Sequence, residues 1–175
     1  THAERLGRES GSPESQSSQK AERQAMLREA RDTMERLKTA ELQDYFGDEC
    51  VAAANTKKRT PDRTPAGTAI IHPIVLPDRV VLLMTMPDGM RQVSAAVDAD
   101  QLHDTVIQFR RRVQTRTDNQ FLHTAWTLHD WLIRPMTPVL AAQNIHTLII
   151  APDGPLRLIP FAALHNREHF LIEKY

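Results

Sequence analysis

The chain contains one cysteine, Cys50, and a thiol is the most reactive nucleophile among its side chains. Asp48 and Glu49 stand directly before it. Neighbouring carboxylates disfavour the thiolate, which is the form that attacks a substrate. We therefore predict a structural role for Cys50. Without a second cysteine, the chain can form neither an internal disulfide nor a cysteine-built zinc site.

Four histidines are candidates for metal binding or proton transfer. His165 and His169 have the four-residue spacing of two zinc ligands on a helix, but the three polar residues between them are typical of a turn and no third ligand is evident. His123 and His129 fall in a segment with the pattern of a buried helix, where a hydrogen-bonded core histidine is the ordinary case. The sequence therefore predicts no metal site, and no pattern in it requires a cofactor.

An acidic residue at a sharp turn, Asp153, is the strongest candidate for a ligand-binding residue. Asp153 lies in Pro-Asp-Gly-Pro after an apolar run, with Arg157 four residues further on. The carboxyl ends of parallel strands are where α/β proteins collect functional groups, so Asp153 could attract a basic substrate side chain. In the alternative, Asp153 hydrogen-bonds its own turn, Gly154 permits the corner and Arg157 is a turn or surface partner. We favour the structural alternative and predict no catalytic residue.

The elements around this corner have the pattern of an α/β layer. Residues 148–151 are continuously apolar, which is typical of a strand covered on both faces, so we expect Ile149 to be buried inside a sheet. The helix pair from Asp100 to Arg134 is expected to cover that strand. A buried segment over 156–164 and a second strand over 170–172 complete the expected order.

Upstream, a three-strand meander is predicted over 69–76, 79–86 and 91–97, with tight Pro-Asp connections. The middle strand is apolar on both faces and should be central. Pro73 lacks an amide hydrogen, so it should place the first strand at an edge or a bulge.

The amino-terminal third divides by composition. Residues 1–19 have too few large apolar side chains for stable order and are predicted as a disordered linker. Residues 20–54 are predicted as a helical arm, which either packs on the following domain or ends a helical array. Residues 55–67 are predicted as a second linker, and 68–175 as the α/β domain. The apolar stripe of the arm consists of Leu27, Ala30, Met34 and Leu37. The basic residues of the second linker are Lys57, Lys58, Arg59 and Arg63.

Composition excludes several classes of function. The formal net charge is zero, with 22 basic and 22 acidic residues, so no overall field favours nucleic acid or an anionic membrane. No apolar run reaches the length of about 18 residues that a membrane helix requires. We expect a cytoplasmic protein with a protein or peptide partner.

The run from Leu148 to Leu164, followed by Phe-Leu-Ile-Glu at 170–173 and Tyr175, resembles the CHAT proteins, a caspase-like family associated with tetratricopeptide repeats. Weaker likeness extends back to about Ala40. The resemblance implies a cysteine endopeptidase whose histidine and cysteine follow adjacent parallel strands, both downstream of the matching segment.

The resemblance therefore implies a truncated, mixed α/β domain of the caspase-like CHAT type behind a helical arm. Its first functional hypothesis is a piece of a cysteine endopeptidase that lacks the catalytic pair and is inactive alone. The alternative is a noncatalytic interaction or regulatory module. A sheet edge left open after Tyr175 is expected to cause self-association.

Overall fold

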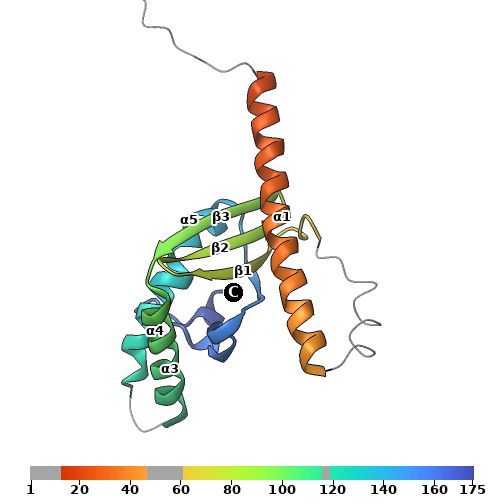
Figure 1. The fold of residues 1–175 in the computed structure, drawn as a ribbon. Coiled ribbons are helices and arrows are strands. Elements are labelled where there is room, and N and C mark those ends of the chain that lie inside the picture. Colours follow the sequence, from red (N-terminus) through yellow and green to blue (C-terminus); the bar gives the residue numbers. More distant parts are fainter. Residues whose placement is uncertain (1–12, 47–60, 116–118) are drawn as a thin grey trace, which may run out of the picture.

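A computed structural model describes residues 13–46, 61–115 and 119–175 of the chain (Figure 1). Within these ranges, helices pack on one four-stranded mixed sheet in an α/β architecture, which confirms the predicted fold class. The longer elements are α1 (Pro13–Phe46), β1 (Thr68–Leu76), β2 (Arg79–Met86), β3 (Gly89–Ala96), α3 (Ala99–Thr115), α4 (Phe121–Leu132), α5 (Thr137–Ala142) and β4 (Thr147–Ile150). The short 3₁₀ helices are η1 (Arg134–Met136), η2 (Gly154–Leu158), η3 (Phe161–Ala163) and η4 (Leu171–Glu173).

The four strands form one sheet in the order β3-β2-β1-β4. β1, β2 and β3 are the predicted antiparallel meander, and β2 lies between its two neighbours as expected. β4 pairs in parallel with the first half of β1, from Thr68 opposite Thr147 to Ile71 opposite Ile150. The chain between β1 and β4 passes through β2 and β3 and then through α3, α4 and α5, and a long connection of this kind allows the parallel pairing.

A glycine sets the register of that parallel pair. The Gly67 carbonyl oxygen accepts hydrogen bonds from the amides of His146 at 2.9 Å and Thr147 at 3.0 Å, so β1 and β4 start together. Gly67 has a φ of +76°, and a Cβ at this position would lie 2.1 Å from the His146 ring. Only glycine fits both constraints without displacement.

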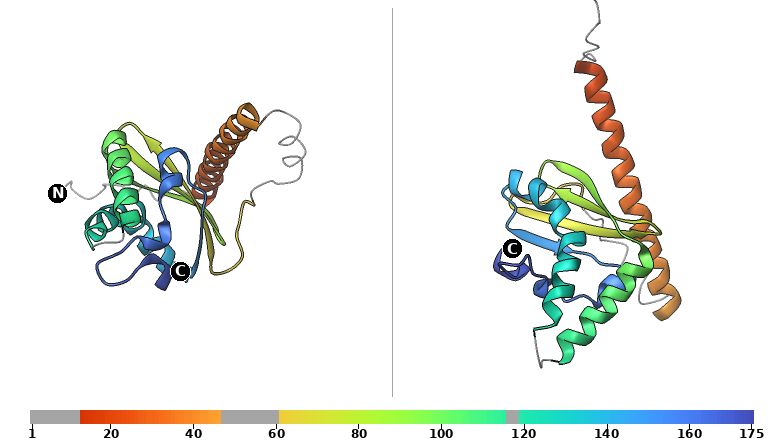
Figure 2. Two further views of the ribbon diagram at one scale, coloured as in Figure 1. Left: turned by 90° about the horizontal axis from the view of Figure 1, so that it is seen from below. Right: turned by 90° about the vertical axis from the view of Figure 1, so that its left-hand side faces the viewer.

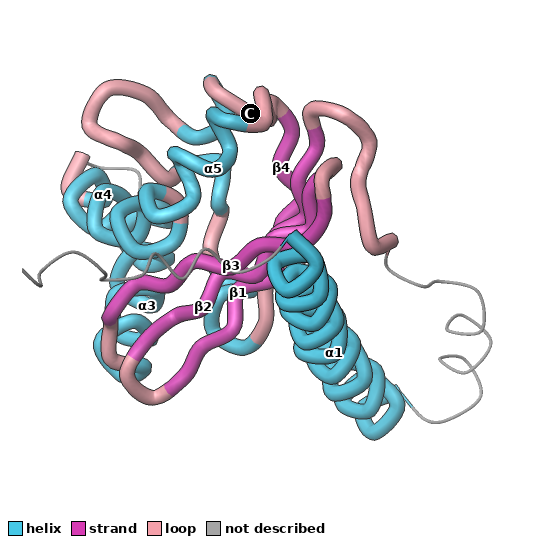
Figure 3. Tube along the Cα trace, turned by 90° about the horizontal axis from the view of Figure 1, so that it is seen from above, coloured by secondary structure: helices cyan, strands magenta, loops and turns pink. Residues whose placement is uncertain are grey.

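Helices cover the two faces of the sheet separately. Figure 3 shows α1 on one face and α3, α4 and α5 on the other. The second face carries the main core, where Leu82 and Met84 of β2 meet Phe109 of α3 and Leu128 of α4, all with no exposed surface. Figure 2 shows that α1 extends well past the sheet, and the described side chains of residues 15–23 are all exposed.

The predicted placement of β4 was wrong. β4 lies at the edge of the described sheet, and the Ile149 side chain is 50% exposed instead of buried. Of the predicted covering pair, α4 packs on β2 and β3, while α3 packs on η2. A continuous apolar run indicates a buried strand only when both of its neighbours are present, and here β1 is the single described neighbour.

Three further expectations need correction. Residues 170–172 do not form a second strand, because η4 begins at Leu171 and only one isolated bridge joins Phe170 to His165. β1 is an interior strand, although Pro73 lies beyond the last residue pair with β4, so its missing amide hydrogen breaks no bond to that strand. Residues 13–19, expected in a disordered linker, belong to α1.

Candidate functional site

The corner after β4 is built by its own side chains. The Ala151 amide donates to the Ile71 carbonyl at 2.9 Å and extends the strand by one residue. Asp153 then has an extended backbone, and its Oδ1 accepts a hydrogen bond from the Gly154 amide at 2.8 Å. Gly154 has a φ of +50° and turns the chain into η2. These contacts support the structural interpretation of Asp153, and a contact with a basic substrate stays a prediction.

Arg157 forms ion pairs at the same corner. Its guanidinium lies 2.7 Å from the Asp153 carboxylate and 3.7 Å from Glu41 of α1. It also lines a cavity of about 370 Å³ between α3 and the segment 157–160. Because Asp153 is already paired, the charge that could attract a basic ligand is largely neutralised within the corner.

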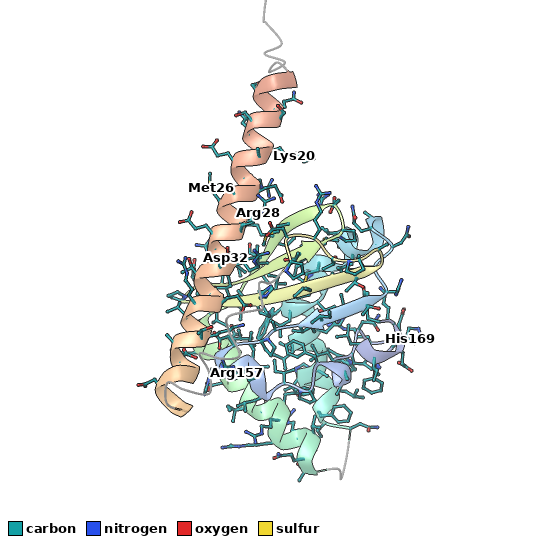
Figure 4. All side chains as sticks on the ribbon, turned by 90° about the vertical axis from the view of Figure 1, so that its right-hand side faces the viewer. Lys20, Met26, Arg28, Asp32, Arg157 and His169 are labelled. Carbon is teal, nitrogen blue, oxygen red and sulfur yellow. The ribbon has the colours of Figure 1, made fainter. Side chains whose placement is uncertain are left out.

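The carboxyl-terminal half of α1 reaches the same corner. Lys38 donates to the Ala151 carbonyl at 3.0 Å, and Glu41 approaches Arg157. In Figure 4, Arg157 lies beside the lower part of α1, and His169 lies on the opposite side of the molecule. The helical arm therefore touches the end of β4 directly. No pattern in the sequence indicates this contact, because residues more than a hundred positions apart form it.

The face of α1 that packs on the sheet differs from the predicted apolar stripe. Leu27 is buried and Met34 is half-buried, but Ala30 and Leu37 are exposed. Among the described side chains of this helix, Arg31 is the most deeply buried, with no exposed surface. Part of the contact between α1 and the sheet is therefore made by polar side chains, where an apolar stripe was expected.

Arg31 holds α1 to the residues before β1. Its guanidinium lies 2.8 Å from Asp32 and 2.9 Å from Asp62, and it donates to the Pro61 carbonyl at 3.1 Å. Burial disfavours the charged form, but the hydrogen bonds to Asp32 and Asp62 together outweigh it and raise the pKa of Arg31. The predicted linker before β1 is in this part a fixed segment.

Gln24 joins α1 to the edge strand β3. Its side-chain amide donates to the Met90 carbonyl at 2.7 Å and its carbonyl accepts from the Met90 amide at 2.8 Å. This reciprocal pair satisfies backbone groups that an edge strand would otherwise expose to other chains.

His72 is a buried titratable group beneath α1. Its Nε2 lies 3.1 Å from Glu35, and its buried Nδ1 has no hydrogen-bond partner among the described residues. Burial lowers the pKa of His72; Glu35 opposes this shift and the nearby Lys38 and Arg31 add to it. A neutral ring that donates from Nε2 to Glu35 fits this arrangement. Sequence reasoning missed His72, because a single histidine in an apolar strand carries no chemical pattern.

The four predicted histidines have separate environments. The His165 Nδ1 accepts from the Trp126 indole at 3.1 Å and from the Arg167 amide at 2.9 Å. His169 is exposed. Within the described ranges, no group of three histidine, cysteine or acidic side chains has the geometry to hold a metal ion.

The expectation for the α4 histidines was wrong. His123 is exposed at the edge of the Trp126 ring. His129 is mostly buried, yet its Nδ1 has no hydrogen-bond partner among the described residues, and burial lowers its pKa. His123 is therefore not a core histidine, and the His129 Nδ1 lies 3.9 Å from the Asp130 carboxylate, beyond hydrogen-bond distance.

Cys50 and the basic residues Lys57, Lys58 and Arg59 lie outside the described residues, so their predicted roles stay predictions. Arg63 is exposed. Across the part of the chain that the structure describes, no helix combines the length and the apolar character needed to span a membrane.

Comparison with protein-family models gives a match to the carboxyl-terminal part of the chain. Residues 122–175, which comprise nearly all of α4 together with α5, β4 and the corner, match the model of the CHAT domain. This match confirms the resemblance predicted from the corner sequence. No curated protein matches the chain significantly.

Proposed function

We propose that the chain forms the noncatalytic front part of a caspase-like CHAT peptidase domain and has no peptidase activity by itself. The observation that carries this proposal is the position of β4. It is an apolar strand inside the family match, it pairs with β1 alone among the described residues, and its Ile149 is half exposed. A strand of this kind is a template for further strands. In the proposal, those strands carry the histidine and cysteine of the family.

The test is a peptidase assay on the chain and on Cys50→Ala. With peptides that place Arg, Lys or Asp before the scissile bond, we expect no cleavage above background by either protein. Cleavage that disappears in Cys50→Ala would overturn the proposal, because Cys50 would then be a nucleophile.

A second candidate function is a noncatalytic regulatory module that works in the cytoplasm through a protein partner. It is favoured by the contacts of Lys38 and Glu41 with the end of β4, which link the arm to the corner. The encoding DNA separates the two. A histidine strand and a cysteine strand encoded directly after Tyr175 support the peptidase domain, whereas a natural stop codon there leaves the regulatory module.

A further inference from the structure

A pocket of about 410 Å³ lies away from the corner, between the end of α4, the start of α5 and the segment 166–175. Its volume falls within the range of about 300 to 1,000 Å³ that is typical of small-ligand sites. Neither proposed function uses it. Three cationic side chains and one carboxylate line it among the described residues: Arg134, Arg167, Lys174 and Asp130.

Asp130 fixes two guanidinium groups at the wall of this pocket. Arg167 donates to its two carboxylate oxygens at 3.3 and 2.9 Å, and Arg134 Nε lies 3.5 Å away. The Asp130 side chain is only 18% exposed, and the hydrogen bond from Arg167 lowers its pKa, so it stays ionised. An arginine carries five N–H donors, so both groups keep donors for another acceptor.

The backbone at Arg167 is held in a conformation that a non-glycine residue rarely adopts, with a φ of +83°. Asn166 Oδ1 accepts from the amides of Glu168 at 2.9 Å and His169 at 2.7 Å, and the Arg167 amide donates to His165. The Arg167 guanidinium also lies 5.8 Å from the centre of the Trp126 ring. Strain of this kind persists where surrounding contacts enforce it and is frequent in ligand-binding loops.

The remaining donors of the pocket are not neutralised. Lys174 forms no ion pair with any described carboxylate, and its ammonium lies 5.4 Å from the Tyr175 ring centre. With histidines counted as neutral, the lining side chains carry a formal excess of two positive charges. Ile133, Phe170 and Leu171 supply the apolar part of the wall.

From this arrangement we infer that the pocket binds an organic carboxylate, whose anionic group meets Arg134, Arg167 and Lys174 while its apolar body lies against Phe170 and Leu171. Planar guanidinium groups match the geometry of a carboxylate, and fixed positive charge in a concave wall favours an anion. The carboxylate could belong to a free organic acid or to an acidic residue of a peptide, which present the same chemistry.

Binding can be measured by titrating the ¹⁵N-labelled full chain with benzoate and following its amide chemical shifts. Benzamide is the neutral control, and N-acetyl-Leu-Glu-amide is the peptide probe. We expect localised shifts in residues 129–138 and 166–175, with at least ten-fold weaker binding of benzamide. If benzoate binds more tightly than the peptide probe, the natural ligand is a free organic acid. If the peptide probe binds more tightly, the ligand is a peptide. Either result supports the site.

The decisive variant is Arg134→Gln with Lys174→Gln, which leaves the Asp130–Arg167 pair intact. We expect at least a five-fold loss of benzoate affinity. Lys20→Gln with Arg23→Gln removes the same charge from exposed positions of α1 and should bind like the parent chain. The single variants Arg134→Gln and Lys174→Gln, each expected to lose about half of the effect on a logarithmic scale, decide the matter if the double variant does not fold.

Three results would overturn the inference. Benzoate and benzamide could bind equally, the pocket variant could bind benzoate as tightly as the α1 variant, or the pocket amides could stay unshifted up to about 10 mM benzoate, where the binding free energy would be only about 2.7 kcal/mol.

Discussion

The two faces of the sheet are covered by opposite kinds of contact. On one face, Leu82, Phe109 and Leu128 interlock in a core with no exposed surface. On the other, α1 buries a small cluster around Leu27, and its other contacts are polar, among them those of Arg31, His72 and Gln24. Apolar packing is non-directional and spread over many side chains, whereas the α1 contacts depend on a few directed hydrogen bonds. We infer that packing on the first face stabilises the folded sheet, whereas the contacts on the second face attach α1 to it.

Matched leucine substitutions should give the largest difference between the faces. Leu128→Ala removes a side chain from the main core and should lower the free energy of unfolding by about 4 kcal/mol, near the upper end for buried leucines. Leu27→Ala should cost about 2 kcal/mol, because its smaller cluster can collapse around the gap. Urea unfolding measures both, and equal losses would contradict the proposed division.

Arg31→Met tests the polar contact of α1 directly. It keeps an apolar stem but removes the hydrogen bonds to Asp62 and Pro61, at an expected cost of about 1.5 to 3 kcal/mol. The loss should appear as faster proteolysis within α1 while the sheet stays folded. Arg23→Met, at an exposed position of the same helix, is the control and should change neither quantity.

The stability of the α1 face should depend on pH. The pKa of His72 is lower in the folded chain than the ordinary histidine value of about 6.5, so below pH 6.5 the unfolded chain binds more protons. Stability is therefore complete above pH 6.5 and falls as the pH drops toward the folded pKa. Thermal melting between pH 5 and 8 shows this slope.

His72→Gln separates the two titrating histidines, because it keeps a donor for Glu35 without a proton to gain. His72→Gln should reduce the dependence of stability on pH that comes from the α1 face. His129→Gln should remove only the contribution of His129, which lies on the opposite face of the sheet. An unchanged slope in His72→Gln would exclude His72 as its source.

Ile149→Lys should have the smallest effect on stability, within about 0.5 kcal/mol, because the side chain is half exposed. The substitution should instead reduce self-association of the chain, because a charge on an edge strand hinders pairing with a further strand. Sedimentation velocity should show less self-association than in the parent chain. A loss of several degrees in melting temperature would instead indicate that Ile149 is buried.

Much of the fold followed from local patterns. The alternation in β1 to β3, the apolar stripes of α3 and α4 and the Pro-Asp-Gly corner are properties of neighbouring residues. The edge position of β4 and the 3₁₀ turn at Leu171 depend on which strands are present to pair, which no local pattern contains.

The polar contacts were harder to predict than the elements. Asp153 and Gly154 act within one turn, so their spacing was informative. Arg31 meets Asp62 and His72 meets Glu35 only after the chain has folded, and a charged residue in a helix sequence otherwise indicates a solvent-facing position.

Native-state hydrogen exchange tests the central claim most directly, because it compares the opening of α1 with that of β2 in the same molecule. At neutral pH, we predict that amides in residues 24–40 of α1 exchange at least ten-fold faster than those of β2, corresponding to an opening free energy lower by about 1.4 kcal/mol or more. Exchange of α1 and β2 with the same free energy, in one global step, would contradict the claim that the arm is held separately from the fold.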